Sequence, residues 1–519
     1  MSTTDPPAPR SAPAARRKLR PGWSLKVAPE DLSLRPMSFK DWLREIWFAG
    51  SLGVIASMIA HVIAMIVMAL IVISHPERTE ADPYLISWLD PSQTPPETKR
   101  KPVSLPLTIA TAPTPSPSAP PETVTPPAAT AYSSQVAVRP ADVRGALGGR
   151  GAGTGGGGAA NPGELERLGG SASAQSAIKS GLAWLARQQT SDGRWELHQG
   201  YPDPGRSVVR TDTGATALAL LALLGAGHTP YSGDHAQVVK KGLQWLIDVQ
   251  DRETGDLHDQ RQEEGRQPAF YAHAMGTIAL CEALAMTKDD RWLGPPAQKA
   301  VEYLLGSQHP DNGGWKYRPI SRMMVGDLSV TGWALMALHT ARMAGLKVPQ
   351  ADFERASAFL DSVQTQQGAR YKYEPLDPAN RVTAALTAEG LLCRQWLGWP
   401  KDHPPMQNGV NWLLSDENAP EWMPGRRNVY AWYYTAQMLH NLGGDPWQKW
   451  YPPVRDTIVK HQVSGGSAKS PNDVRGSWHP TQPPGLGEEY SDKAGRLYVT
   501  AMCLLILETP YRHRPLYEE

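Results

Sequence analysis

The sequence predicts an all-α protein: an (α/α)6 toroid, a ring of six helix pairs, preceded by one transmembrane helix and a disordered linker. Three stretches of the chain lead to this fold class. Residues 47–74 form an apolar run, residues 76–170 are rich in Pro and then Gly, and residues 171–519 repeat a two-helix pattern. The chain has 52 Lys+Arg against 51 Asp+Glu, and this balance argues against a nucleic-acid partner.

The run 47–74 contains no Asp, Glu, Lys or Arg from Trp47 to Ser74 and is long enough to cross a lipid bilayer, at about 1.5 Å of rise per residue. The segment 1–45, expected to be mostly disordered, is rich in Lys and Arg, whereas acidic residues appear soon after the run. The positive-inside rule therefore predicts a single-pass membrane protein with a cytoplasmic N-terminus and the toroid on the periplasmic or exterior side. His61 lies mid-span, where it could contact a partner membrane protein or be a tolerated packing residue.

The stretch 76–170 offers no apolar surface to bury. It begins with a Pro-rich part, TAPTPSPSAPPETVTPPAAT, which favours an extended polyproline conformation, and continues with the flexible GALGGRGAGTGGGG. We expect it to act as a long tether between the membrane and the ring.

One repeated pattern in 171–519 is an aromatic and an aliphatic residue followed by Gln. A Gly turn and a second aromatic residue follow several copies. The segments around these copies are amphipathic, as in AIKSGLAWLARQ, which predicts half-exposed helices. The Gln positions are Gln189, Gln250, Gln308 and Gln364, with degraded copies at Glu417 and Gln462, and the following aromatics include Trp195, Trp315, Tyr371 and Trp478.

A second pattern alternates with the first: Thr followed by an apolar residue four positions on, in segments that are apolar nearly all round, such as ATALALLALLGAG. Alternation of amphipathic and apolar helices indicates a ring with the amphipathic helices outside and the apolar ones inside. An open solenoid is the alternative, but its paired helices need not differ so strongly in polarity. The Thr positions are Thr216, Thr277, Thr331, Thr435 and Thr500, with Thr383 an imperfect member.

The segment from Gln189 to Trp195 has the Q-x3-G-x-W form of the QW repeat, and Gln308 to Trp315 is a one-residue variant of it. Over residues 172–510 the chain resembles the prenyltransferase/squalene-cyclase repeat superfamily. The resemblance implies the toroid fold and, in the enzymes, a central apolar cavity for isoprenoid chains. It also implies that the QW residues are structural: Gln can cap a helix end while Trp packs over the following turn.

The resemblance stops short of the catalytic motif. Class II cyclases of this superfamily protonate an alkene with D-x-D-D followed by Thr, and the middle Asp is the acid. The corresponding residues here are Asp327-Leu328-Ser329-Val330-Thr331, so the first Asp is kept while Ser329 and Val330 replace the acid and its neighbour. The sequence therefore predicts a degenerate catalytic motif.

The zinc site of the related protein prenyltransferases is also missing. That site needs an Asp-x-Cys pair and a His before the Thr of a late inner helix, where this chain has Val499. Cys281, Cys393 and Cys503 fall in apolar helices, where Cys is usually a small hydrophobic residue. We therefore expect no metal and no cofactor.

Polar residues remain four positions before several inner Thr residues: Asp212, His273, Asp327 and Arg496. They would stand one turn from the Thr, at the rim of the ring, where they could perform acid/base chemistry or hold a polar head group. Asp212 and Asp327 are the candidate catalytic acids, and His273 and Arg496 are candidate ligand-binding residues. The competing interpretation is that each Asp is an ordinary helix cap and that His273 and Arg496 are structural polar groups.

Tyr430, Tyr433 and Tyr434 give one inner helix an unusually aromatic start, which could line an isoprenoid cavity, stack sugars, or simply pack. The leading hypothesis is a binding or scaffold module with an isoprenoid or lipid-like ligand. An active isoprenoid cyclase or prenyltransferase-like enzyme, and a carbohydrate-processing toroid at the outer face, are the alternatives.

Overall fold

The computed structural model describes residues 169–198, 201–203, 209–258, 269–317, 325–465, 473–512 and 515–517, together with Lys40. The chain divides into two units, Met1–Glu122 and Thr123–Glu519, and all elements below belong to the second. The predicted transmembrane run 47–74 with His61, and nearly all of segments 1–45 and 76–170, lie outside the described residues. Their assignments stay predictions.

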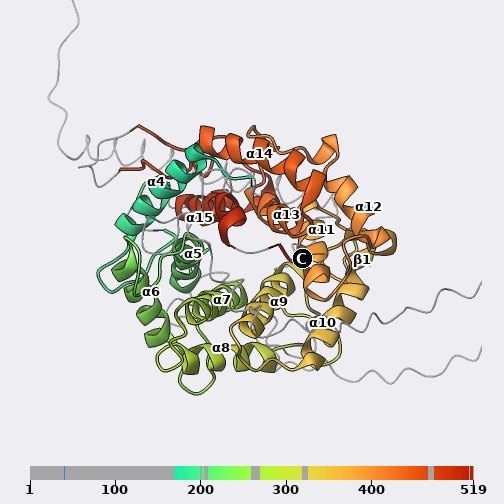
Figure 1. Cartoon of the computed structure of the whole chain (residues 1–519), viewed down its shortest axis with the longest axis horizontal. Coiled ribbons are helices and arrows are strands. Elements are labelled where there is room, and N and C mark those ends of the chain that lie inside the picture. Colours follow the sequence, from blue (N-terminus) through green and yellow to red (C-terminus); the bar gives the residue numbers. More distant parts are fainter. Residues whose placement is uncertain are drawn as a thin grey trace, which may run out of the picture. The chain divides into compact units, whose positions relative to one another are not determined.

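The described part of the second unit is a closed double ring of helices, as Figure 1 shows. Six helices form the outer layer and six form the inner layer, and outer and inner helices alternate along the chain. The outer helices are α4 (Ala172–Gln188), α6 (Ala236–Val249), α8 (Gly294–Gly306), α10 (Gln350–Val363), α12 (Pro404–Leu413) and α14 (Gly444–Lys460). The inner helices are α5 (Asp212–Gly225), α7 (Ala269–Thr287), α9 (Leu328–Met343), α11 (Ala384–Trp396), α13 (Val429–Leu442) and α15 (Ser491–Arg512). The predicted (α/α)6 toroid is confirmed.

Polarity explains which helices lie inside. Every residue of α5 is buried, whereas α6 buries one face through residues such as Val239, Leu243 and Leu246. Inner helices pack against neighbours on both sides, and α15 packs against α5, so the inner layer closes on itself. Helix α7 is long and apolar enough to cross a membrane by composition, but it is mostly buried within this layer.

Four glutamines of the first repeated pattern each join an outer helix to the next one. The amide nitrogen of Gln308 donates to the carbonyl of Gly313 in its own turn and to the carbonyl of Asp352 in the first turn of α10, both at 2.9 Å. Gln462 does the same to Gly476 and to Ala177 of α4, both at 2.8 Å. Since α4 belongs to the first repeat and Gln462 to the last, this glutamine closes the outer layer. Gln189 and Gln250 make the equivalent pairs of hydrogen bonds.

Tryptophans of the same pattern join outer to inner helices. The indole N–H of Trp315 donates to the carbonyl of Leu304 at the end of α8 (2.8 Å), and its backbone N–H donates to the hydroxyl of Thr331 in α9 (3.0 Å). The tryptophan thus satisfies a carbonyl that the helix end leaves free. Trp195 and Trp478 repeat both bonds, with Leu185 and Thr216, and with Ile458 and Thr500.

The fourth repeat departs from the pattern. Gln364 lies in a small hairpin of β1 (Gln364–Thr365), the 3-10 turn Gln366–Gly368 and β2 (Arg370–Tyr371), and pairs with Tyr371. The backbone N–H of Tyr371 donates to the hydroxyl of Thr387. Thr387 is therefore the inner threonine of this repeat, whereas Thr383 is the N-cap of α11 and accepts from the backbone of Leu386.

Candidate functional site

The four predicted rim residues sit at or near the starts of their inner helices, but each is held by its own surroundings. Asp212 lies 3.0 Å from the guanidinium of Arg194. Arg496 donates to the hydroxyl of Ser477 at 2.9 Å and pairs with Asp203. These partners come from different parts of the ring, and within the described residues the structure does not bring the four side chains into one cluster.

His273 uses both ring nitrogens inside the fold. Its Nδ1 accepts from the backbone N–H of Leu257 at 3.1 Å, so the proton of a neutral ring lies on Nε2, which is 3.0 Å from the carbonyl of Ala300. Leu257 occupies the position that Trp195 and Trp315 hold in other repeats. The backbone N–H of those tryptophans donates to the inner Thr, whereas the backbone N–H of Leu257 donates to His273. This geometry fits a structural histidine that links α7 to α8.

Asp327 is the centre of a polar cluster at the start of α9. Its Oδ1 accepts from the backbone N–H of Val330 (3.0 Å) and from the hydroxyl of Ser329 (2.7 Å), which in turn accepts from Tyr271 of α7 (2.6 Å). Its Oδ2 lies 3.4 Å from the ammonium of Lys316. Asp327 is thus both an N-cap and the end of a hydroxyl chain.

Lys316 is shared between two carboxylates. Its ammonium lies 2.8 Å from Oε2 of Glu374 and 4.9 Å from the ring centre of Tyr373, whose hydroxyl pairs with that of Tyr317. Complete burial raises the pKa of Asp327, and Lys316, Ser329 and the Val330 amide lower it in part. The site therefore contains one carboxyl, that of Asp327, and its hydrogen bonds and Lys316 hold it in place. The D-x-D-D motif would supply an acid with an acidic neighbour at this position.

A second carboxyl, not expected from the sequence, lies inside the ring. Glu389 of α11 is fully buried and packs against α9 so closely that a Cβ on Gly332 would stand 2.0 Å from its Oε1. Neither carboxyl oxygen has a regular hydrogen bond within the described residues. Burial raises the pKa of Glu389 well above its ordinary value, the Tyr434 hydroxyl lowers it in part, and the charge of Asp327 raises it further. The sequence signal that could have identified Glu389 is a single acidic residue within the otherwise apolar stretch AALTAEGLLC.

Aromatic rings from two non-adjacent inner helices meet beside Glu389. Trp333 of α9 stacks on Tyr433 of α13 with ring centres 5.6 Å apart, and its indole N–H donates to the hydroxyl of Tyr430 at 3.3 Å. Tyr434 contacts Trp333 edge-on. Because α11 lies between α9 and α13 in the ring (Figure 1), these contacts reach across the interior. We call Trp333, Tyr430, Tyr433 and Tyr434 the aromatic cluster.

A buried ion pair crosses the interior elsewhere. Arg512 of α15 binds both carboxylate oxygens of Glu282 in α7, at 2.6 and 2.7 Å, although α5 separates these helices in the ring. Arg512 also lies 3.9 Å from Glu508, whose pKa is raised well above its ordinary value by burial. These side chains occupy part of the ring interior. Tyr271 and Tyr430, by contrast, are only half-buried.

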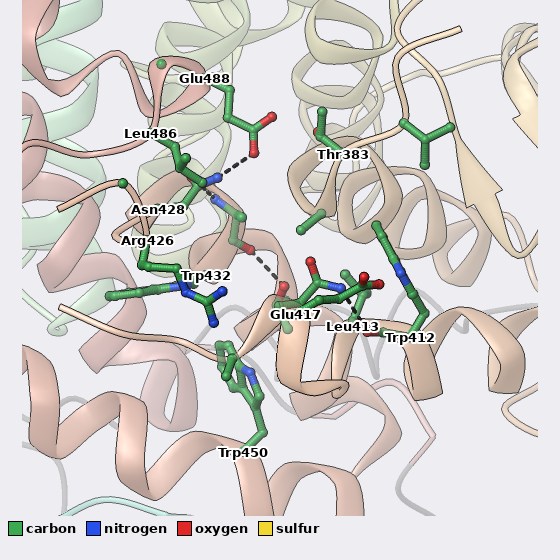
Figure 2. Close-up of a pocket in the computed structure, with 18 residues that line it drawn as sticks. Thr383, Trp412, Leu413, Glu417, Arg426, Asn428, Trp432, Trp450, Leu486 and Glu488 are labelled. Atoms are coloured by element: carbon green, nitrogen blue, oxygen red, sulfur yellow. Dashed lines mark hydrogen bonds between the residues drawn. The ribbon is translucent and has the colours of Figure 1, made fainter. Parts of the chain in front are cut away.

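A pocket of about 550 Å³ lies between the inner and outer layers, among α11, α12, α13 and α14 (Figure 2). Three tryptophans line it, and Glu417, Glu488 and Asn428 contribute polar groups. No pattern in the sequence marks its residues as a pocket. The tryptophans are Trp412, Trp432 and Trp450.

Metal binding has no candidate in the described part of the chain, where no group of three or more His, Cys, Asp or Glu side chains could hold an ion. Cys281, Cys393 and Cys503 are buried in inner helices, and burial raises the pKa of each thiol. They pack as small apolar residues.

Comparison with known proteins supports the resemblance. The model of the squalene-hopene cyclase C-terminal domain matches residues 163–273. A squalene–hopene cyclase of Zymomonas mobilis is 26% identical over 282 residues, which are 48% of this chain and 41% of that protein. The chain thus spans about two fifths of the length of that relative. The predicted resemblance to the prenyltransferase/squalene-cyclase superfamily is confirmed.

Solved structures similar to this chain include two kinds of enzyme. The type II terpene cyclase MstE from Scytonema is 15% identical with a TM-score of 0.42, and the match covers 68% of this chain and 99% of that one. The GH76A α-1,6-mannanase from Salegentibacter sp. HEL1_6 is 11% identical with a TM-score of 0.44, covering 64% and 98%.

Proposed function

We propose that this terpenoid-cyclase-like toroid is a binding or scaffold module that takes an isoprenoid or similar apolar chain at the interior of its ring. The observation that carries the proposal is the position of the half-buried Tyr271 and Tyr430 at the edge of the otherwise buried aromatic cluster, inside a layer of apolar helices. Partly exposed aromatic rings of this kind give an unsaturated hydrocarbon a large contact area.

Loss of cyclase chemistry is proposed from the surroundings of Asp327. Protonation of an alkene needs a carboxylic acid aimed at the substrate and strengthened by its neighbours. Both hydrogen bonds to Oδ1 of Asp327 come from its own helix start, and Lys316 stands at Oδ2. Ser329 and Val330 provide no second acid.

One observation favours the competing function, an active isoprenoid enzyme. Glu389 is a buried carboxyl next to the aromatic cluster, and burial raises its pKa well above the ordinary value, which favours the protonated form. A protonated acid beside aromatic faces is the pair of groups that proton-initiated chemistry would need. Asp327 and Asp212, the acids proposed from the sequence, are each paired with a cation.

An assay with squalene and geranylgeranyl compounds separates the two functions. The full chain in detergent is incubated with each compound, and bound compound and products are both quantified. The binding function predicts retention of unchanged compound by the wild type and by Glu389→Gln and Asp327→Asn, with weaker retention by Trp333→Leu. Conversion that disappears in Glu389→Gln or Asp327→Asn, with the helical signal unchanged, would instead establish an enzyme.

The membrane anchor belongs to the same proposal. Residues 47–74 would hold the toroid to the bilayer on the periplasmic or exterior side, with His61 as the candidate contact for a membrane protein partner. An apolar ligand drawn from that bilayer would then meet the ring at high local concentration. Protease accessibility of the ring in sealed vesicles of known orientation tests this topology.

Carbohydrate processing through Tyr433 and Tyr434 receives no support from their surroundings. Their side chains are 3% and 0% exposed and pack against Trp333. A saccharide would need a different surface.

A further inference from the structure

The pocket among α11–α14 opens where the outer ring lacks its usual link. Glu417 occupies the position that holds Gln189, Gln250 and Gln308 in earlier repeats, and those glutamines tie one outer helix to the next. The carboxylate of Glu417 is exposed and makes no hydrogen bond within the described residues. The loop after α12 and the 3-10 turn Gly487–Glu489 instead border a cavity of about 550 Å³, a size that holds a small molecule or a short oligomer.

The tryptophans of the pocket use their indole N–H groups differently from several tryptophans of the core. The indole N–H groups of Trp184 (3.1 Å), Trp315 (2.8 Å) and Trp478 (2.7 Å) donate to backbone carbonyl oxygens. Trp412, Trp432 and Trp450 make no such bond within the described part of the chain. The pocket therefore combines aromatic faces with indole donors that have no hydrogen bond there, and the guanidinium of Arg370 already lies 4.3 Å from the ring centre of Trp412.

An acidic and amide-bearing wall faces these rings (Figure 2). The side-chain amide of Asn428 donates to Glu488, and the amide oxygen of Asn428 caps α13 by accepting from Ala431 at 3.0 Å. Asn428 and Thr383 thus fix the carboxyl of Glu488 in one orientation, and burial raises its pKa. Arg426 is already engaged with Glu421 at 3.1 Å, so it brings no free cation to the pocket.

We infer that this pocket binds a neutral saccharide, with sugar rings stacked on the tryptophans and hydroxyl groups bonded to Glu488, Glu417 and the free indole N–H groups. A polyhydroxylated ring is the ligand class that supplies apolar C–H faces, hydroxyl donors for carboxylates and oxygen acceptors for indoles together. A hydrocarbon would leave the carboxylate of Glu417 and the indole donors without hydrogen bonds, and an anion would face two carboxyl groups. A cation would use the carboxylates but none of the three N–H groups.

This site is separate from the aromatic cluster, and it does not depend on the proposed function. Leu486, which lines the pocket, is 39% exposed, so further units of a bound oligosaccharide would meet an apolar side chain there. We therefore expect oligomers to bind more tightly than single sugars.

Titration calorimetry with three probes tests the inference on the full chain in detergent: maltotetraose, mannotetraose and chitotetraose. At least one should bind, and Trp412→Phe, which keeps an aromatic face but loses the N–H, should weaken that binding about tenfold, the size expected for one lost hydrogen bond in a desolvated site. Glu488→Gln should weaken it similarly. Glu417→Gln, a change on an exposed side chain that leaves folding intact, should weaken it to a smaller extent.

Trp292→Phe is the matched control, because Trp292 is a half-buried tryptophan before α8 and outside the pocket, and it should bind like the wild type. Saturation-transfer NMR should show sugar C–H protons as the atoms nearest the protein. Failure of all three probes to bind would overturn the inference. So would binding that Trp412→Phe, Glu488→Gln and Glu417→Gln all leave unchanged, or displacement of the sugar by tetramethylammonium or inorganic phosphate at equal concentration.

Discussion

At the residue scale, the raised pKa of Glu389 should make the stability of the protein depend on pH. Burial raises its pKa well above the ordinary 4.5, so the folded protein binds this proton more tightly than the unfolded chain does. The stability that comes from holding the proton is complete below the unfolded pKa. It is lost as pH rises from that value toward the folded pKa.

Replacement of Glu389 by Gln should therefore change stability in a pH-dependent way. Gln has the same shape and cannot ionise, so the variant should gain stability relative to the wild type as pH rises above about 4.5. The difference should grow by at most about 1.4 kcal/mol per pH unit, the limit for a single proton. Chemical denaturation at pH 4, 6 and 8 measures it.

Glu302→Gln on the exposed face of α8 provides the comparison, and its difference from the wild type should stay nearly constant across the same range. Asp327 interacts electrostatically with Glu389, so Asp327→Asn should shift the pH range of the Glu389→Gln effect without abolishing it. A Glu389→Gln difference that is flat with pH would show that Glu389 is not held protonated.

The positions of single residues could be predicted from the sequence, but their contact partners could not. Asp212 and Asp327 were placed correctly at inner-helix starts because helix periodicity fixes such positions. Their cation partners, Arg194 and Lys316, lie in preceding turns, and only the fold brings them together. Glu389 was missed because its environment comes from α9 and α13, which no local pattern reveals.

At the element scale, the alternation of amphipathic and apolar helices was enough to predict the two layers. The repeated Gln and Trp were recognised as structural, but their contacts differ from the expected helix cap. The glutamine spans its own turn and the next outer helix, and the tryptophan bonds the end of the preceding helix. Such bonds between repeats depend on ring curvature, which sequence spacing does not supply.

Gly476 gives a test of the link that closes the outer layer. Its φ is +91°, and a Cβ would stand 2.1 Å from the carbonyl oxygen of Ser180 in α4. Gly476→Ala should therefore lower the free energy of unfolding by about 2 kcal/mol or more, from backbone strain and displacement of α4. Thermal unfolding followed by circular dichroism measures the loss.

Gly306→Ala is the control at the end of outer helix α8, where a Cβ would meet nothing within 4 Å. It should leave stability unchanged or slightly higher, because Ala favours helix over Gly. Equal effects of the two substitutions would contradict a tight contact between Gly476 and α4.

The fourth and fifth repeats are elements in which the sequence pattern weakens, at Thr383 and at Glu417. The weakened pattern was visible in the sequence, but the structures that replace the regular turn and link were not. A hairpin replaces the fourth turn, and the pocket opens beside the fifth. Whether a missing link closes up or leaves a cavity is decided by packing of neighbouring helices.

At the scale of the whole molecule, closure of the ring is made by contacts between the first and last repeats. Gln462 bonds Ala177, and α15 packs on α5, so residues nearly three hundred positions apart are neighbours. The sequence predicted a ring but left its interior undetermined. Side chains that cross it, Trp333 with Tyr433 and Arg512 with Glu282, fill part of that interior.

The proposed function requires that an apolar chain binds within this partly filled ring. Native mass spectrometry of the full chain, extracted gently from its own host membranes, tests it most directly. We predict one stoichiometric adduct with the mass of an isoprenoid, retained by the wild type and by Trp292→Phe and reduced in Trp333→Leu. A clean apo mass in all three proteins under several extraction conditions would contradict the claim.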